Sequence, residues 1–222
     1  MAFVVRVWDA PTRLFHWALV LCVTGLVISG NLGGAAMSWH FRLGYCTATL
    51  LLFRLIWGVI GGYWSRFSSF FYGRQHLLRF LAGQGTASDH IGHNPLGALS
   101  VFAMLMFLSM QVTSGMLSDD EIAAAGPLVS HVSSLWVGYA TYYHKHFGKP
   151  VLLGLIVMHI GAIAFHFFGK HDNLIWPMLT GDKTLRHDSK KSIDSALRRW
   201  IALAVIFLCT ALVSSLVFML EA

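Results

Sequence analysis

Charged residues are scarce in this chain of 222 residues: they make up 12% of it, while 56% of the residues are hydrophobic. Mean hydropathy is correspondingly high, at +0.62. Ordinary soluble domains contain about 25% charged and about 45–50% apolar residues. The composition therefore excludes an ordinary soluble domain and predicts an integral membrane protein.

Five apolar stretches are close to the roughly 20 residues that a membrane-spanning helix needs. They are residues 14–29, 40–60, 96–116, 143–168 and 200–220. Because these stretches account for most of the chain, residues 1–222 are predicted to form a single domain of the all-α membrane class. No cleavable signal peptide is evident, since Arg6 and Arg13 precede a first stretch that lacks a small-residue cleavage pattern.

The net charge of +6 is unevenly distributed between the loops. Basic residues gather before the first stretch, between the second and third, and between the fourth and fifth; they are Arg6, Arg13, Arg66, Arg74, Arg79, Lys170, Lys183, Arg186, Lys190, Lys191, Arg198 and Arg199. The positive-inside rule places these segments in the cytoplasm. These loops lack the aromatic clusters of a nucleic-acid surface, so no nucleic-acid partner is expected.

The remaining loops predict the other face of the membrane. Residues 31–39 carry no charge, and the loop after residue 116 begins with Asp119, Asp120 and Glu121. We therefore expect a multi-pass membrane protein in contact with lipid. Its amino terminus is predicted to lie on the cytoplasmic side and its carboxyl terminus on the outer side.

Four histidines stand at informative positions in these stretches: His16, His40, His144 and His159. An imidazole inside a membrane is costly without a partner, so this pattern favours metal or haem ligation. His144 and His159 are 15 residues apart, which is about 22 Å along an α-helix. The predicted topology places His40 and His144 in an outer layer, and His16 and His159 in an inner layer.

Each layer predicts one haem held between two imidazoles, His40 with His144 and His16 with His159. Because no C-x-x-C-H sequence occurs, the haems would be held without thioether bonds. With both axial positions filled, the irons have no open site for oxygen or substrate, and such haems carry electrons.

Two ligand assignments have rivals on the fourth stretch. At about 100° per residue, His144 lies about 60° from the face of His159, whereas His146 lies about 140° away. Pro150 lies between them, and a kink or bulge there would change the phase. His166 follows His159 by seven residues on almost the same face and is the alternative inner ligand.

Several segments carry a resemblance to a known family. They are W-D-A-P-T-R-L-F-H-W at residues 8–17, His40 with Gly44 and then R-L-I-W-G at 54–58, G-H-N-P-L-G at 92–97, and the region from His144 to His159 followed by D-N-L at 172–174. Over nearly its whole length the chain resembles the bacterial cytochrome b561 and nickel-iron hydrogenase b-type cytochrome family. The family usually spaces its two fourth-helix ligands by 14 residues, and this chain offers 15 or 13.

The resemblance implies a four-helix transmembrane bundle that holds two haem b groups, plus a fifth C-terminal transmembrane helix that ligation does not need. It also implies electron transfer across the membrane between quinone or quinol and a redox partner. That partner would be a c-type cytochrome or a dehydrogenase or hydrogenase subunit.

Three further residues gain meaning from this arrangement. Arg54 follows His40 by 14 residues, so it lies on nearly the same face and at the level of the inner haem. Its guanidinium is a candidate partner for a haem propionate, with extension to the inner headgroups as the alternative. Arg13 is a candidate for the same propionates or an inner-surface topology signal. Gly44, one turn after His40, would admit either the flat macrocycle or a closely packed helix.

A quinone site is less well defined. His93 and Asn94 precede the third stretch and Gln111 lies towards its outer end, each offering hydrogen bonds at a membrane boundary. Capping of the third helix by Asn94, with Pro95 in the first helical position, explains that segment without a ligand. Gln111 has the alternative of bonding a neighbouring helix.

Two functional hypotheses follow from the sequence. The first is a dihaem electron-transfer cytochrome that acts alone or as a subunit of a quinone-linked oxidoreductase, without catalytic residues of its own. The second is a transporter whose histidines bind a metal ion or relay protons. A transporter would be expected to place its ionisable groups along one path near the midplane, whereas these histidines form two layers.

Overall fold

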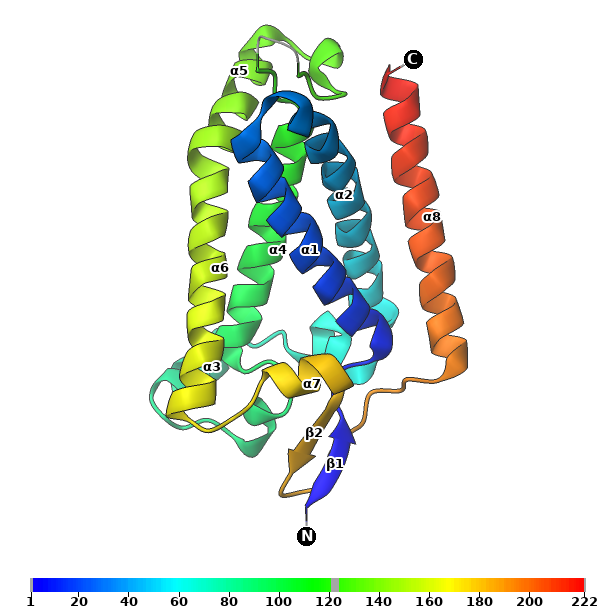
Figure 1. Cartoon of the computed structure of the whole chain (residues 1–222). Helices are drawn as coiled ribbons and strands as arrows, with labels where there is room; N and C mark the ends of the chain where they lie inside the picture. The colour runs from blue at the N-terminus through cyan, green and yellow to red at the C-terminus, as the bar shows by residue number, and fades with distance from the viewer. Residues whose placement is uncertain (1, 121–123, 222) are drawn as a thin grey trace. The chain divides into compact units, whose positions relative to one another are not determined.

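The computed structural model of the chain describes residues 2–120 and 124–221 and is mostly helical. Within these residues, five helices are long and apolar enough to cross a membrane (Figure 1). They are α1 (Ala10–Leu32), Gly34–Ile60 with α2 (Met37–Ile60), α4 (Pro95–Met116), Ser134–Gly169, and Ala196–Leu220 within α8 (Ala196–Glu221). The predicted all-α membrane fold is thereby confirmed.

The fourth spanning helix begins nine residues earlier than the predicted residue 143. It consists of α5 (Ser134–Tyr142), a π-helical segment (Tyr143–Gly148), α6 (Lys149–Ala164) and a second π-helical segment (Phe165–Gly169). The predicted start is wrong because α5 is itself apolar and helical, with Leu135 and Trp136 exposed on its surface. The sequence anticipated a kink or bulge near Pro150, but it did not predict the second π-helical segment.

Contacts divide the chain into two compact units, each of which includes parts of the long helices. The strand unit comprises Met1–Phe15, Arg54–Ala103 and Val157–Leu203. The cavity unit comprises His16–Phe53, Met104–Ile156 and Ala204–Ala222. The two units are described separately below.

The strand unit contains a small sheet that the sequence did not predict. Strands β1 (Phe3–Arg6) and β2 (Asp182–Leu185) pair antiparallel and lie side by side in Figure 1. Arg6 pairs with Asp182 in the register, and its guanidinium also donates to Asp182 (2.6 Å) and to Asp194 (2.8 Å). Two short helices, α3 (Arg74–Leu81) and α7 (Ile175–Thr180), complete this unit.

Asp9 organises the start of α1 in the strand unit. Its side chain is fully buried and accepts the Thr12 backbone N–H at 2.8 Å, as a helix N-cap does. The same carboxylate accepts from the Trp57 indole, the Gly62 backbone and the Ser65 hydroxyl. One buried charge therefore connects the start of α1 with the end of α2 and the turn that follows it.

The cavity unit is held by apolar side chains. Leu51 of α2, Leu108 of α4 and Leu152 of α6 form one buried cluster. Other apolar side chains of this unit face outward: Leu21 and Phe207 are each 73% exposed. Such exposed apolar surface on long helices suits contact with lipid.

Candidate functional site

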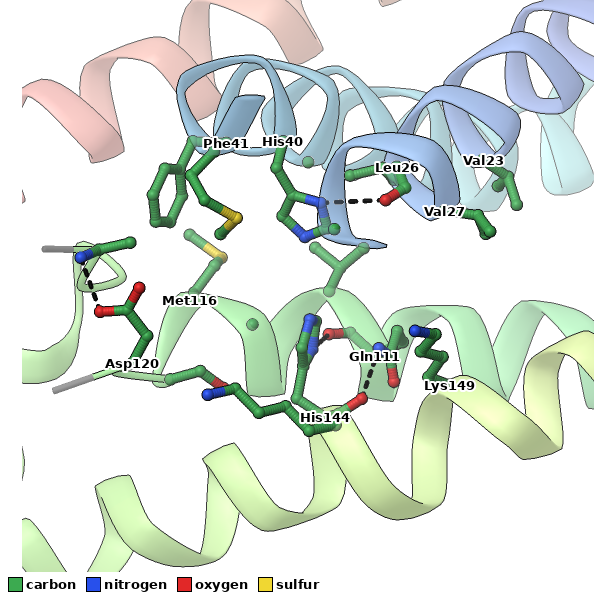
Figure 2. Close-up of a pocket in the computed structure, with 18 of the residues that line it drawn as sticks. Val23, Leu26, Val27, His40, Phe41, Gln111, Met116, Asp120, His144 and Lys149 are labelled. Atoms are coloured by element: carbon green, nitrogen blue, oxygen red, sulfur yellow. Dashed lines mark hydrogen bonds between the residues drawn. The ribbon is translucent and has the colours of Figure 1, made fainter. Parts of the chain in front are cut away.

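His40 and His144 converge on one cavity inside the cavity unit. His40 lies in the first turn of α2, and His144 lies in the π-helical segment Tyr143–Gly148. Their ring centres are 6.1 Å apart and their planes are nearly perpendicular, at 85°. The cavity has a volume of about 380 Å³ and both rings line it (Figure 2). The predicted outer pair is thus brought together.

Both rings are oriented by a backbone carbonyl of a neighbouring helix. Nδ1 of His40 lies 3.1 Å from the carbonyl oxygen of Leu26 on α1, and Nδ1 of His144 lies 2.9 Å from that of Gln111 on α4. A carbonyl oxygen only accepts, so each Nδ1 must carry the proton. Each Nε2 then carries the lone pair, which is the arrangement found in metal-ligating histidines.

His146 is placed differently from His144. It is exposed, its ring centre lies 5.2 Å from that of Tyr142 with the planes tilted, and it is absent from the lining of the cavity. A π-helical turn contains about one residue more than an α-helical turn, so the separation of 15 positions from His144 to His159 turns the helix by about as much as 14 positions of α-helix. The segment therefore reconciles this chain with the 14-residue spacing that the resemblance implies.

The inner candidates are divided between the two units. His16 lies on α1 in the cavity unit, half-buried, with its ring against Trp17 at 5.2 Å. His159 lies on α6 in the strand unit and is also half-buried. His166 belongs to the second π-helical segment, where its Nδ1 lies 3.8 Å from the Asp172 carboxylate.

Arg54 is buried in the strand unit, with 4% of its surface exposed. Its guanidinium lies over the ring of Phe67, 4.5 Å from the ring centre, and its Nη1 has no hydrogen-bond partner among the described residues. Such burial contradicts the alternative in which the side chain extends to lipid headgroups. A buried cation with an unsatisfied donor suits the carboxylate of a bound group.

Comparison with known proteins decides the family. The sequence profile described as prokaryotic cytochrome b561 matches residues 7–181. The chain belongs to this family. As a b-type cytochrome, a member of the family carries haem b, and membrane electron transfer is the activity that the family implies.

Related cytochromes cover most of the chain. A probable Ni/Fe-hydrogenase B-type cytochrome subunit of Rhizobium leguminosarum is 26% identical over 216 residues, which is 82% of this chain and 90% of the relative. A protein of the same description from Cupriavidus necator is 27% identical, covering 81% of this chain and 87% of its own. A probable Ni/Fe-hydrogenase 1 B-type cytochrome subunit of Escherichia coli is 28% identical over 49% of this chain and 57% of its own. No solved structure matches the chain.

The cavity suits the cofactor of a cytochrome b561. It offers two neutral imidazoles with Nε2 lone pairs and apolar walls that include Leu108 and Leu152. Its volume falls in the usual range of ligand pockets, about 300–1,000 Å³. Gly44 also lines it, and a Cβ there would meet nothing within 4 Å. Among the described residues, no group of three or more His, Cys, Asp or Glu is arranged to hold a metal ion.

Two other candidate site residues, Arg13 and Asn94, bind groups within the protein. Arg13 donates to the Leu179 carbonyl and lies 4.0 Å from Asp194, both in the strand unit. Asn94 accepts the Gly97 backbone N–H at 2.7 Å, so the expected cap of α4 is confirmed. The contact with Gly97 accounts for Asn94 without a ligand, whereas Nε of Arg13 is buried with no hydrogen-bond partner among the described residues.

The residues considered for a quinone site, His93 and Gln111, also contact other parts of the protein. His93 packs between Trp8 and Phe70, with ring centres at 4.7 and 4.6 Å. The amide nitrogen of Gln111 donates to the backbone carbonyl of His144 at 3.0 Å, which confirms the alternative of a bond between helices. Of the acidic residues in the loop after α4, Asp119 and Asp120 line the cavity, while Glu121 lies outside the described residues.

Sequence reasoning missed the residues that hold the two histidines in place. Ser29 and Gly30 contact His40, and Ser114 and Gly115 contact His144. A signal was present, because V-I-S-G at residues 27–30 and V-T-S-G at residues 112–115 follow one pattern. A four-residue repeat is too short to predict a role by itself, and its role follows only from the contact that each copy makes with a histidine.

Proposed function

We propose that the chain is a dihaem b-type cytochrome that carries electrons across the bacterial inner membrane, between quinone and a redox partner protein. The observation that carries this proposal is the convergence of His40 and His144 on one apolar cavity, each with Nδ1 bound to a backbone carbonyl. These two residues would hold the outer haem. When bound, the haem supplies reversible one-electron chemistry, and two imidazole ligands leave no open site on iron.

The inner haem is proposed to lie between His16 and His159, with His166 as the alternative to His159. Arg54 supports an anionic group at this level, because its buried guanidinium has a donor without a partner among the described residues. Haem propionates would satisfy that donor. Arg13 stands in the same unit and would add positive charge at the inner surface.

A hydrogenase subunit is the proposed partner, because the relatives are named as probable Ni/Fe-hydrogenase cytochrome subunits. A c-type cytochrome and another dehydrogenase subunit are the alternatives. Quinone or quinol would be the second reactant, so the chain acts as the electron-transfer component of a quinone-linked oxidoreductase. Two histidines on each haem would leave no open coordination site on iron, which suits electron transfer.

The proposed orientation places the amino terminus in the cytoplasm and the carboxyl terminus in the periplasm, from the basic loops. Alkaline phosphatase, which is active only outside the cytoplasm, tests this when fused at two positions. We expect activity for a fusion after Ser130 and none for a fusion after His187. The opposite pattern would reverse the orientation while leaving the haem assignment untouched.

The haem assignment is tested by the reduced-minus-oxidised spectrum and the haem-to-protein ratio of the purified protein. We expect two noncovalent b haems. His40→Ala and His144→Ala should each remove one of them, and His16→Ala and His159→Ala the other. His146→Ala is the matched control, since this exposed histidine lies two residues from His144 and should leave both haems in place.

The outcomes separate the proposals. A colourless protein would overturn the cytochrome assignment and favour a histidine-based metal or proton transporter. Loss of the outer haem in His146→Ala but not in His144→Ala would keep the function and change the ligand. Loss of the inner haem in His166→Ala but not in His159→Ala would do the same for the inner site.

A further inference from the structure

Each histidine of the cavity unit rests against a serine and a glycine of a neighbouring helix. The hydroxyl of Ser29 on α1 lies 3.3 Å from Nδ1 of His40, and that of Ser114 on α4 lies 3.3 Å from Nδ1 of His144. Both serines are buried, with 5% and 8% of their surface exposed. Each imidazole N–H is therefore shared between a backbone carbonyl and a hydroxyl.

The adjacent glycines admit the rings. A Cβ at Gly30 would lie 3.0 Å from Cε1 of His40, and a Cβ at Gly115 would lie 2.7 Å from Cε1 of His144. Distances this short force a shift of the ring or of the helix. Glycine at both positions is therefore what allows the imidazoles to approach the carbonyls of α1 and α4.

The two contacts are copies of one arrangement. In α1 the carbonyl, hydroxyl and glycine come from Leu26, Ser29 and Gly30; in α4 they come from Gln111, Ser114 and Gly115. Residues i, i+3 and i+4 share one helix face, so each triplet forms a single surface against its histidine. Two different helices present the same surface to two different ligands.

The serine hydroxyls act as acceptors towards the rings. Ser29 donates its own proton to the Gly25 carbonyl at 2.7 Å, and Ser114 donates to the Gln111 carbonyl at 3.0 Å. With the hydroxyl proton used in this way, the oxygen is left to accept from Nδ1–H. An acceptor on Nδ1–H makes the imidazole a stronger electron donor through Nε2. A stronger donor favours the oxidised iron and lowers the reduction potential.

We propose that Ser29–Gly30 and Ser114–Gly115 are matched positioning elements that lower the reduction potential of the haem between His40 and His144. This inference rests on the proposed function, and it assigns the control of potential to residues that do not touch iron. The serines set the electron density of the ligands. The glycines set how closely the ligands approach the helices that orient them.

The test is a spectroscopic redox titration of the purified protein carrying its haems, with the outer haem identified by its loss in His40→Ala. Ser29→Ala and Ser114→Ala should each raise the midpoint potential of that haem. We expect a shift of up to about tenfold in the oxidation equilibrium, equivalent to about 59 mV for one electron. The double variant should shift further than either single variant, while the inner haem keeps its potential.

Ser109→Ala is the matched control for the serines. Ser109 lies on the same helix α4 and makes the same type of bond to a helix carbonyl, to Leu105 at 2.8 Å, but it contacts neither histidine. Gly154→Ala is the control for the glycines, because a Cβ there meets nothing within 4 Å. Gly30→Ala and Gly115→Ala should weaken retention of the outer haem by about 10–100-fold, and Gly154→Ala should not.

The outcomes distinguish this inference from the proposed function. An unchanged outer potential in both serine variants, or an equal shift in Ser109→Ala, overturns the inference while the haem assignment stands. If one serine variant loses the outer haem and keeps the inner one, the potential is read from the other serine variant, and an unchanged potential there overturns the inference. A wild-type protein without haem overturns both.

Discussion

The two units of this chain use polar groups in opposite ways. In the strand unit, the buried carboxylates are paired within the protein: Asp9 accepts four hydrogen bonds, and Asp194 pairs with Arg6 and Arg199. In the cavity unit, the polar groups turn towards an apolar cavity and leave ligand atoms exposed to it. The first arrangement stabilises the fold of the strand unit, and the second forms a binding site for a cofactor.

This difference predicts that substitutions of the buried carboxylates change the stability of the fold, whereas substitutions in the cavity change cofactor binding. Removing one of these buried carboxylates leaves its donors unsatisfied and should destabilise the fold. Filling the cavity should prevent cofactor binding and leave the fold largely unchanged. Four substitutions test this contrast.

The largest effect is expected in the strand unit for Asp9→Ala. It leaves the Trp57 indole, the Gly62 amide and the Ser65 hydroxyl buried without their shared acceptor. At about 1–3 kcal/mol for each unsatisfied buried donor, the loss should be at least about 3 kcal/mol. Denaturant unfolding in detergent measures it. Asp188→Ala, at an exposed aspartate, is the control and should change stability by less than about 0.5 kcal/mol.

The next effect tests the cavity with Gly44→Leu. A side chain at this position meets no atom within 4 Å at its Cβ, so the chain should fold, but the side chain would enter the cavity. We expect loss of the outer haem alone, measured as the haem-to-protein ratio. Gly154→Leu, where space is equally open but which does not line this cavity, should retain both haems. Retention of both haems in Gly44→Leu would show that the macrocycle does not reach this wall.

Arg54→Met brings the comparison to the inner haem. A buried positive charge favours the reduced, less positive iron, so its removal should lower the inner potential. We expect about a tenfold change in the oxidation equilibrium, or about 59 mV for one electron. Arg42→Met is the control, because Arg42 is exposed and stacks on Trp39. If Arg54→Met changed the stability of the protein but not the inner potential, Arg54 would have only a structural role, through its contact with Phe67.

What the sequence predicts well are features with a local or periodic signature. The apolar runs predicted α1 and α4 closely, and the histidine depths predicted the meeting of His40 with His144. The β1–β2 sheet escaped prediction because its two four-residue strands lie at opposite ends of the chain, and neither pattern reveals a partner so distant. Pro150 predicted a kink or bulge in this region, but the bounds of the π-helical segment Tyr143–Gly148 could not be predicted, because an extra residue in one turn leaves no compositional trace.

The polar contacts of each site were predictable only in part. Asn94 before Pro95 is a recognisable cap, and it caps α4. The burial of Arg54 depends on Phe67, which comes from the turn after α2 and which no periodicity places over the guanidinium. Similarly, the roles of Ser29 and Ser114 could not be predicted, because they depend on contacts with histidines that come from other helices.

The smallest effect concerns Asp89 in the strand unit. Burial alone would raise the pKa of this carboxyl, but hydrogen bonds from the Thr86 backbone and from His76 outweigh it and hold the pKa below its ordinary 3.8. A lowered folded-state pKa stabilises the fold above the ordinary value, and this contribution is lost as the pH falls through the folded-state value. Asp89→Asn should therefore cost about 1–2 kcal/mol near neutral pH. The difference from wild type should shrink as the pH falls below 3.8, measured by unfolding at several pH values. A difference that stays constant with pH would show that the Thr86 and His76 bonds do not depend on the charge of Asp89.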